Sequence, residues 1–398
     1  MKRFFSINRD FYSKPFVGLL AANMFFWMSV NLFLPVLPIY YHRLGLNDHE
    51  VGTAIGAYSI GALLFRVIGG KAVDKYGSRP VIAAGIALSI LAIGSYCAAD
   101  TLLGATAARL MHGIGISGYS AAALTMTALL HEDKNITEAV AVYTLSTMIG
   151  IGVAASSAGW IFNHTNFVTI VGLGILATGL SLLFFPKTPG AKKKPTEGAA
   201  PPFLQVIVRP GILIPTLCLL GANLCYAAVM TFLPLFMVSN GIQQFSLFYI
   251  TYSVTVVLSR VWVGKLCAVF TPEKLAFFVL VVLACSLFVI SLGGYWWILA
   301  VGGAGIGIGY GLAFPALATI VSRSVSIESR GTAFGFFTMA VDAGFAIGAI
   351  GLGFVADGYG YSTVFLAAGA YTVLFALMYI WELVPKIRLA VSEQSGQG

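Results

Sequence analysis

Five ionisable side chains lie deep inside long apolar stretches of this sequence, namely Arg66, Arg109, His112, Arg260 and Asp342. A charge in such surroundings is costly, so each of these residues is expected to have a partner or a functional role. Asp342 is the only carboxylate at this depth. Because a nearby arginine favours the ionised form of a carboxylate, a moving arginine could make Asp342 bind and release a proton. The alternative is a static ion pair between Asp342 and Arg66 or Arg260.

The second candidate is the pair formed by Arg109 and His112. The two residues are three positions apart, so they share roughly one face of a helix. A histidine changes its charge near neutral pH, and His112 could therefore carry a proton. It could equally contact a small molecule or be a hydrogen-bonded core residue. If two of the arginines reach a cavity, that cavity is electropositive and favours anionic or zwitterionic solutes. If the arginines serve helix pairing or gating instead, the cavity is close to neutral.

The composition indicates which elements must hold these side chains. The 398 residues are 58% hydrophobic and 10% charged, with a mean hydropathy of +0.89. Soluble globular proteins carry about 25% charged residues, so a cytosolic enzyme, a secreted disulfide scaffold and a disordered regulator are excluded. The apolar residues form long unbroken runs rather than the alternating pattern of a membrane β-barrel. The sequence therefore predicts an all-α membrane protein.

Twelve apolar runs are long enough to cross a bilayer as helices. A segment rich in Lys, Pro and Gly at 186–210 separates the first six runs from the last six. This predicts an N-terminal six-helix bundle at 1–185, a cytoplasmic linker, and a C-terminal six-helix bundle with its tail at 211–398. The twelve predicted spans are 16–41, 50–70, 79–98, 101–129, 138–161, 167–185, 211–238, 245–268, 275–294, 296–321, 331–355 and 362–383.

The basic residues that give the chain a net charge of +8 predict its orientation. If both termini face the cytoplasm, 19 of the 23 Lys and Arg residues lie in cytoplasmic segments and only Arg43 lies in an external one. Positively charged loops tend to stay on the cytoplasmic side of a membrane. The first apolar run is too long for a cleavable signal peptide. We expect a multi-pass protein of the cell inner (plasma) membrane with both termini in the cytoplasm.

The two halves of the chain resemble each other. Residues 58–71 (YSIGALLFRVIGGK) match 252–265 (YSVTVVLSRVWVGK) at an offset of 194, and the match includes the intramembrane arginine of each half. LLAAN near the start recurs as LLGAN in the second half, and GIG at 113–115 recurs at 305–307. Such an ordered repeat predicts two bundles related by an axis along the membrane normal, with a substrate site where they meet.

The loop between the second and third predicted spans carries a recognisable motif. The sequence GGKAVDKYGSRPVI at 69–82 resembles the Gly-x-x-x-Asp-x-x-Gly-x-Arg signature of the major facilitator superfamily. Its four matching residues are Gly70, Asp74, Gly77 and Arg79. The run RLMHGIG at 109–115 resembles a second motif of the family, often linked to proton-coupled members. The resemblance implies the major facilitator fold, with twelve helices in two pseudo-symmetric six-helix bundles, and a loop that closes the cytoplasmic side during alternating access.

In this family the first, fourth, seventh and tenth spans are expected to line the central cavity. The side chains that the resemblance places there are Asn23, Trp27, Asn31, Arg109, His112, Tyr119, Asn223, Tyr226 and Tyr310. Tyr58 and Tyr252 are their repeat-related neighbours. Aromatic walls with a few polar groups suit an amphipathic organic ligand. Proton coupling is expected at Asp342 and His112, and gating at the loop signature with Arg66 and Arg260.

The expected function is secondary active transport rather than catalysis. We expect proton-coupled export of a small amphipathic molecule, either drug-like or anionic or zwitterionic, for example a siderophore. The alternative is an uptake symporter for a carboxylate or a sugar. A membrane-embedded enzyme or receptor would need a set of catalytic residues or a signalling domain, and the sequence shows neither. Neither zinc-type spacing nor a nucleotide-binding loop is present, so no metal or cofactor is expected. The expected partners are the substrate, protons and the lipid bilayer, without nucleic acid, and the protein is expected to be a monomer.

Overall fold

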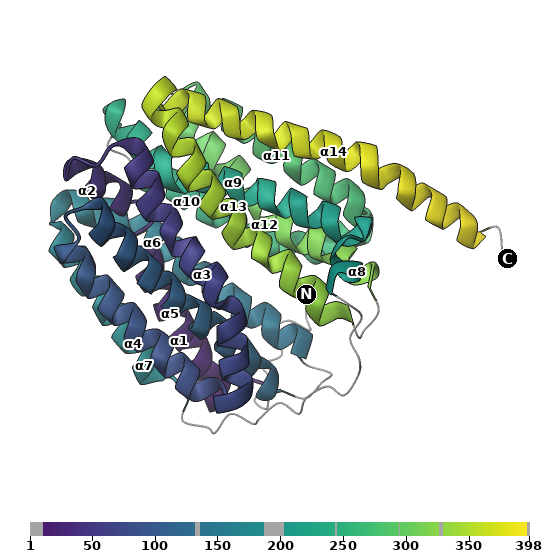
Figure 1. The fold of residues 1–398 in the computed structure, drawn as a ribbon, viewed down its shortest axis with the longest axis horizontal. Coiled ribbons are helices and arrows are strands. Elements are labelled where there is room, and N and C mark those ends of the chain that lie inside the picture. Colours follow the sequence, from purple (N-terminus) through teal and green to yellow (C-terminus); the bar gives the residue numbers. More distant parts are fainter. Residues whose placement is uncertain are drawn as a thin grey trace. The chain divides into compact units, whose positions relative to one another are not determined.

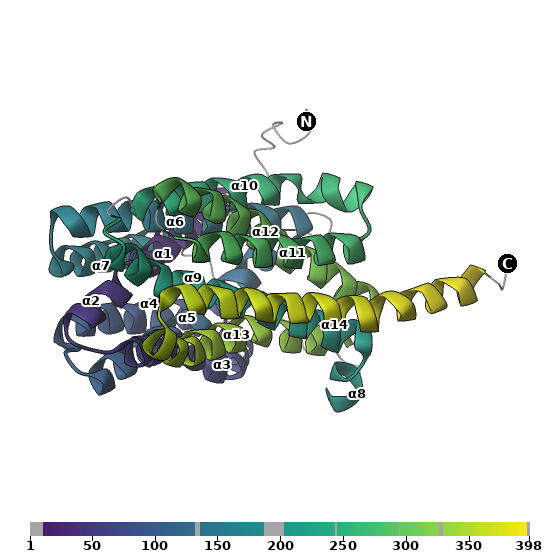
Figure 2. The same cartoon turned by 90° about the horizontal axis from the view of Figure 1, so that it is seen from above.

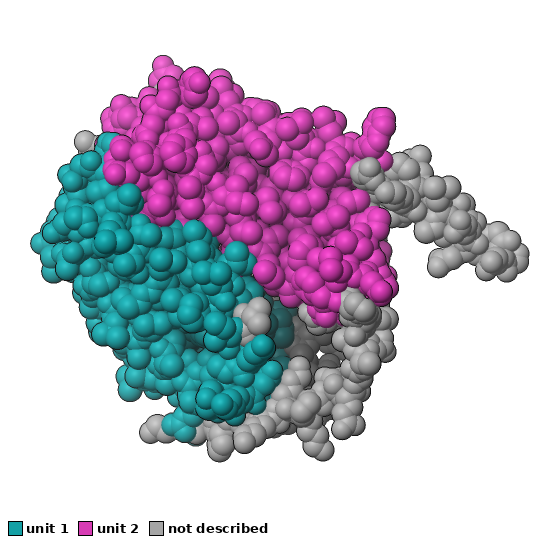
Figure 3. All heavy atoms as spheres, viewed as in Figure 1, with its two compact units in different colours: residues 1–46, 57–195 teal, residues 47–56, 196–398 magenta. Residues whose placement is uncertain are grey.

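The computed structural model describes residues 11–131, 136–186, 203–242, 245–293, 295–325 and 329–395. Within these ranges the chain is helical and contains no β-strand. It divides into two compact units, which Figure 3 shows in different colours. Unit 1 comprises residues 1–46 and 57–195, and unit 2 comprises residues 47–56 and 196–398. Most of the predicted linker at 186–210 lies outside the described residues.

Unit 1 consists of long helices with two short elements, drawn in the purple to blue colours of Figure 1. The elements are α1 (Lys14–Asn31), α2 (Leu37–Arg43), α3 (Asp48–Tyr76), α4 (Ser78–Ser95), η1 (Tyr96–Ala98), α5 (Leu102–Leu129), α6 (Ile136–His164) and α7 (Phe167–Phe184). The first turns of α3 belong to unit 2. α1 packs against α6 and α7, and α4 packs against α5 and α7. The contact faces form an apolar core around Phe26, Ile82 and Tyr119.

The first predicted span is interrupted in the structure. The apolar run at 16–41 predicts one continuous helix, but residues 32–36 separate α1 from α2. Pro35 lies in this segment, and proline removes a backbone donor and disfavours a helical conformation of the residue before it. The amide of Val36 bonds instead to the carbonyl of Phe33 at 3.2 Å, which closes a turn. The prediction of a continuous helix is therefore wrong at this proline.

Unit 2 is built in the same manner. Its elements are α8 (Phe203–Ile207), α9 (Pro210–Ser239), α10 (Phe245–Val269), α11 (Pro272–Ser291), α12 (Trp296–Arg323), α13 (Arg330–Tyr359) and α14 (Tyr361–Ser395). α9 packs against α13 and α14, and α12 packs against α10 and α11. α11 and α14 lie side by side in both views of the ribbon (Figures 1 and 2). α9 is buried along most of its length, so it is the central helix of this unit.

Nine of the described helices are long and apolar enough to cross a membrane, and a tenth is the bent pair Asp48–Arg66 and Ile68–Tyr76 within α3. The two long helices that remain of the predicted twelve are α1 and α5. Both carry polar side chains that the sequence assigns to a binding site, such as Asn23 and Arg109. The all-α, many-span architecture is thereby confirmed.

Two glycines make equivalent helix contacts in the two units. A Cβ at Gly113 would collide with the carbonyl of Tyr58, so only glycine lets α5 lie this close to α3. Gly307 lies in the same way against the carbonyl of Tyr252, where α12 meets α10. Gly307 comes 194 positions after Gly113, and Tyr252 comes 194 positions after Tyr58. This is the offset of the long repeat match. The shorter GIG match predicts a different register for these helices, and that part of the prediction is wrong.

Candidate functional site

A buried guanidinium is the centre of the candidate site in unit 1. α5 begins after Thr101, whose hydroxyl caps the helix by accepting a hydrogen bond from the amide of Gly104 at 3.2 Å. Further along α5, Arg109 is only 3% exposed. Its guanidinium carbon lies 4.3 Å from the centroid of the Tyr58 ring, and its Nη1 donates to the hydroxyl of Tyr96 at 3.2 Å. An aromatic face and a hydroxyl thus partly replace the water that this cation has lost.

The Tyr96 hydroxyl joins Arg109 to His112. Its oxygen lies 2.6 Å from His112 Nδ1. The hydroxyl can donate to Nδ1 or accept from it, according to which nitrogen of the imidazole carries the hydrogen. His112 is fully buried. Neither His112 Nε2 nor Arg109 Nε has a hydrogen-bond partner in the described part of the chain.

The positive charge of Arg109 is therefore not balanced within the described ranges. Its contacts there are a ring and a hydroxyl, and none is a carboxylate. A buried donor without an acceptor costs about 1–3 kcal/mol, and more when it is charged. A carboxylate is the acceptor whose shape and charge suit a guanidinium best. The arrangement in unit 1 is thus suited to receive an anionic group.

A second polar cluster lies in unit 2 and is mainly aromatic. The rings of Tyr226 on α9 and Tyr310 on α12 stack with centroids 4.2 Å apart and an interplanar angle of 12°. The hydroxyl of Tyr310 donates to Asn223 Oδ1 at 3.1 Å, and the amide of Asn223 donates to the carbonyl of Leu219 at 2.8 Å. Tyr252 on α10 lies beside Tyr226, with ring centroids 6.2 Å apart. Such a stack with polar groups at its edge can hold the flat part of an amphipathic ligand.

Two charged residues accompany this aromatic cluster. Arg260 on α10 has an Nε without a hydrogen-bond partner among the residues that the structure describes. Asp342 on α13 is 8% exposed. Both lie within electrostatic range of Tyr310. Unit 2 therefore brings together the residue predicted for proton coupling, one predicted gating arginine and the predicted aromatic lining.

Three predicted lining residues on α1 have contacts that serve packing inside unit 1. The amide nitrogen of Asn23 lies 2.8 Å from the Ser146 hydroxyl and 2.7 Å from the Thr147 hydroxyl, which ties α1 to α6. Asn31 donates to the carbonyl of Trp27 on its own helix at 2.8 Å. Trp27 is half-buried and packs against the apolar core. The Oδ1 of Asn23 is buried without a hydrogen-bond partner among the described residues, and a role of the two asparagines in binding stays a prediction.

Tyr119 also sits in the core of unit 1. Its ring stacks on Phe26, with centroids 3.6 Å apart and an interplanar angle of 12°. Its hydroxyl has no hydrogen-bond partner among the described residues. Tyr119 therefore packs in the core of unit 1. Its contact with a ligand stays a prediction.

The loop signature lies where α3 meets α4. Gly77 separates the two helices and has a φ of +84°, a conformation that a side chain would strain. Asp74 and Arg79 are exposed, and Arg66 is half-buried. A Cβ added at Gly70 would meet nothing within 4 Å. The geometry thus explains one glycine of the signature, and the gating roles of the other residues stay predictions.

Sequence reasoning did not find Tyr96, although it connects the two most prominent polar residues of unit 1. Tyr96 belongs to a short 3-10 element that follows α4, and no periodic pattern marks its side chain. The repeat match did single out Tyr58, the residue whose ring faces the Arg109 guanidinium. Within the described ranges no group of three or more His, Cys, Asp or Glu side chains could hold a metal ion.

The chain is similar in sequence to known membrane transporters. The profile of the family described as Major Facilitator Superfamily matches residues 19–295 and 241–396. The staphylopine export protein of Staphylococcus aureus is 24% identical over 383 residues, which cover 92% of this chain and 95% of that protein. The uncharacterized MFS-type transporter YhhS of Escherichia coli is 23% identical over 382 residues, which cover 92% of each chain.

Solved structures have the same fold at lower identity. A variant of the nucleoside transporter NupG matches with a TM-score of 0.80 at 16% identity, covering 93% of this chain and 100% of that one. A bacterial homolog of the human lysosomal transporter Spinster matches with a TM-score of 0.74 at 15% identity, covering 95% and 97%. The profile match extends over nearly the whole chain, and the helices agree with it. The chain therefore belongs to the major facilitator superfamily, and it is a multi-pass membrane transporter rather than an enzyme.

Proposed function

We propose that this protein is a secondary active transporter that exports a small amphipathic anion or zwitterion in exchange for protons. The observation that carries the proposal is the buried Arg109, whose Nε–H has no acceptor within the described ranges and lies in one network with His112. A charged residue at the centre of a membrane helix costs about 2.5–3.5 kcal/mol. A carboxylate of the substrate offsets this cost, because a hydrogen bond between charged groups contributes about 1.5–3 kcal/mol.

The aromatic cluster of unit 2 supports the amphipathic part of the proposal. The stacked rings of Tyr226 and Tyr310 provide a flat apolar surface, and Asn223 provides a polar group at its edge. A substrate with a carboxylate and a planar apolar part satisfies both kinds of site. In this account the two sequence halves at 1–185 and 211–398 are the bodies that move during alternating access.

Proton coupling is assigned to Asp342. It is the carboxylate buried in α13, in electrostatic range of the aromatic cluster. A carboxylate in such surroundings binds a proton when a neighbouring cation moves away and releases it when the cation returns. His112 is the second proton-binding group of the proposal, but it is fully buried, and a second hydrogen would place another positive charge in the network of the buried Arg109. Asp342 is therefore the primary carrier.

Export is the proposed direction because a relative with similarity over nearly the whole chain is named as the exporter of staphylopine. The distribution of Lys and Arg favours an orientation in the plasma membrane with both termini in the cytoplasm. We further propose that the monomer is the transporting unit.

Membrane vesicles with naphthoate as the probe test the direction. Export coupled to protons predicts that naphthoate accumulates in inverted vesicles whose lumen is acidic. Passive diffusion of a weak acid leads to accumulation on the alkaline side, so it cannot produce this result. Uptake symport predicts the opposite result: naphthoate accumulates only in right-side-out vesicles in an acidic medium, and faster than in vesicles carrying Asp342→Asn. That result would contradict export.

A further inference from the structure

The first turn of α3 has a cap that is local in sequence. The amide of Glu50 donates to Asn47 Oδ1 at 3.0 Å, and the amide of Asn47 donates to Glu50 Oε2 at 3.0 Å. This reciprocal pair is a capping box. It leaves the amides of Asp48 and His49 without an acceptor on α3, as expected for the first turn of a helix.

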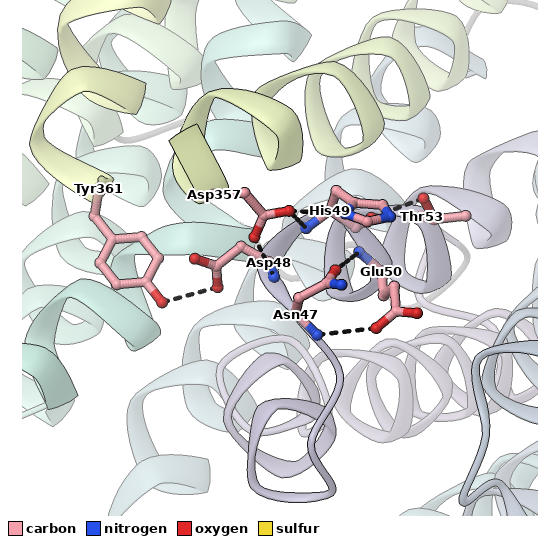
Figure 4. A network of polar contacts seen from close by, with 7 residues as sticks. All are labelled: Asn47, Asp48, His49, Glu50, Thr53, Asp357 and Tyr361. Atoms are coloured by element: carbon pink, nitrogen blue, oxygen red, sulfur yellow. Dashed lines mark hydrogen bonds and ion pairs between the residues drawn. The ribbon is translucent and has the colours of Figure 1, made fainter. Parts of the chain in front are cut away.

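Asp357, near the end of α13, accepts hydrogen bonds from both of these amides. Its Oδ1 accepts from the amide of Asp48 at 2.8 Å, and its Oδ2 accepts from the amide of His49 at 3.2 Å (Figure 4). The same Oδ2 lies 2.7 Å from His49 Nδ1. A carboxylate at the N-terminus of a helix is also favoured by the helix dipole. One side chain of α13 thus caps α3 and contacts its histidine.

Close packing surrounds this contact, whose residues all belong to unit 2. The imidazole of His49 stacks on Phe354, with ring centroids 4.9 Å apart and an interplanar angle of 10°. A Cβ at Gly353 would lie 2.7 Å from the Cα of His49, so the approach of α13 requires glycine there. Tyr361, the first residue of α14, donates to Asp48 Oδ1 at 2.8 Å. We name this contact the α3–α13 latch, formed by Asp48, His49, Asp357 and Tyr361.

The charges of the latch make it sensitive to protonation. Among the seven residues of Figure 4, His49 is the only basic one. The acidic groups are Asp48 and Glu50 on α3 and Asp357 on α13, and the remaining titratable group is Tyr361 on α14. A histidine ordinarily changes its charge between about pH 5 and 8, where carboxylates stay ionised. The side chains of His49 and Asp357 are 36% and 31% exposed, so protons from the surrounding solution reach them.

We propose that the latch holds α3 and α13 together more tightly at acidic pH, so that external acidity favours the state in which the outer side of the transporter is closed. An imidazolium attracts the carboxylate of Asp357, whereas a neutral imidazole offers only a hydrogen bond. The inference rests on the proposed function, because alternating access separates helices of the two sequence halves at this end. The orientation proposed from the basic residues places the start of α3 on the outer side.

Hydrogen–deuterium exchange of the full chain in nanodiscs tests the latch without any substrate. The amides of Asp48 and His49 are read in a peptide that starts at or before residue 46, at about pH 5.5 and about pH 8, after correction for the intrinsic exchange rate. We expect protection at the lower pH to be greater by up to about fivefold, the size that one partly exposed ion pair provides.

Two histidine variants separate the latch from general effects of pH. His49→Gln keeps a hydrogen-bond donor but cannot become cationic, so the pH dependence of protection should disappear. His164→Gln is the matched control, because His164 is exposed at the end of α6 and its Nδ1 lies 2.8 Å from the carbonyl of Trp160. This control should keep the pH dependence of the wild type.

The proposal is overturned if wild-type protection is equal at both pH values, or if His49→Gln keeps the wild-type pH dependence. Asp357→Asn removes the charge of the capping group, so it should lower protection at both pH values. If a variant fails to fold, which size-exclusion chromatography reveals, the wild-type comparison still decides. Because exchange requires no transport, the latch and the proposed function can fail independently of each other.

Discussion

Replacing Arg109 with glutamine tests the role of the buried cation most sharply. Glutamine keeps a hydrogen-bond donor but removes the charge and the contact with the Tyr58 ring. No carboxylate within the described ranges depends on Arg109, so its removal does not leave an opposite charge unpaired there. The loss of the bond to Tyr96 costs about 1.5–3 kcal/mol because its donor is charged, and the relief from burying a charge offsets this cost. We therefore expect Arg109→Gln to fold.

The expected loss is in binding rather than in stability. A hydrogen bond to a charged group contributes about 1.5–3 kcal/mol, which corresponds to an increase in Kd of about 10- to 150-fold. This loss applies to naphthoate, whose carboxylate is the proposed partner of Arg109. A permanent cation of the same shape, (naphthylmethyl)trimethylammonium, should bind the variant at least as well as it binds the wild type.

Thermal unfolding of the detergent-solubilised protein at increasing ligand concentration measures both affinities, because a ligand that binds the folded state raises Tm. Tyr379→Phe is the matched control, since Tyr379 is fully buried and its hydroxyl has no hydrogen-bond partner among the described residues. An unchanged Kd for naphthoate in Arg109→Gln would refute the assignment. An equal loss for both ligands would indicate general damage rather than a missing charge.

Four further substitutions have defined outcomes. Tyr96→Phe removes the hydroxyl shared by Arg109 and His112, which leaves a buried N–H of Arg109 and the Nδ1 of His112 unpaired. The free energy of unfolding should therefore fall by about 1–3 kcal/mol, and Tm should fall with it. Gly77→Ala should lower the free energy of unfolding by about 1–3 kcal/mol because of the positive φ at this position. Gly70→Ala is the control: Gly70 has a helical backbone and open space for a Cβ, so this substitution should leave Tm unchanged or raise it. Asp342→Asn should abolish proton-driven transport in proteoliposomes, while the elution volume and Tm of the protein stay those of the wild type. A normal rate of proton-driven transport would exclude Asp342 as the proton carrier.

Most helix positions were predictable because apolar runs end next to residues that cap helices or break them. The run predicted to start at 275 starts at Pro272 in the structure, directly after Thr271, whose hydroxyl caps the helix. Two features were not predictable from apolar content. Pro35 interrupts a run that is apolar on both sides, and α14 continues to Ser395, beyond the point where the apolar residues end. Hydropathy reports the length of an apolar segment, but not a bend within it or a helical extension beyond it.

In unit 1, the contact between two site residues could be predicted from helix geometry only where both lie on one helix. Arg109 and His112 are three positions apart on α5, so their proximity follows from helix geometry. Tyr96 joins them from another element, and only tertiary packing places it there. Likewise, the half of the α3 cap formed by Asn47 and Glu50 fits a known sequence pattern, whereas the half formed by Asp357 comes from 309 positions away and has no local signal.

The register between corresponding helices of the two halves was also not predictable from the sequence, because glycine contacts determine it. The repeat match predicted which helices correspond in the two halves, but the contacts of Gly113 and Gly307 with tyrosine carbonyls decide the register between them. Glycine is so frequent in these helices that several registers bring glycines into alignment. Backbone-to-backbone approach distinguishes these registers, and it becomes visible only in three dimensions.

The charge selectivity of proton-driven transport tests the central claim most directly. In inverted vesicles with an acidic lumen, the initial rates of accumulation of naphthoate and of (naphthylmethyl)trimethylammonium are compared, each corrected for protein-free vesicles. The buried cation of α5 predicts that the wild type accumulates naphthoate faster and that Arg109→Gln loses this preference. Faster accumulation of the ammonium compound by the wild type, or an undiminished naphthoate rate in Arg109→Gln, would contradict the assignment of Arg109 as the group that receives the substrate anion.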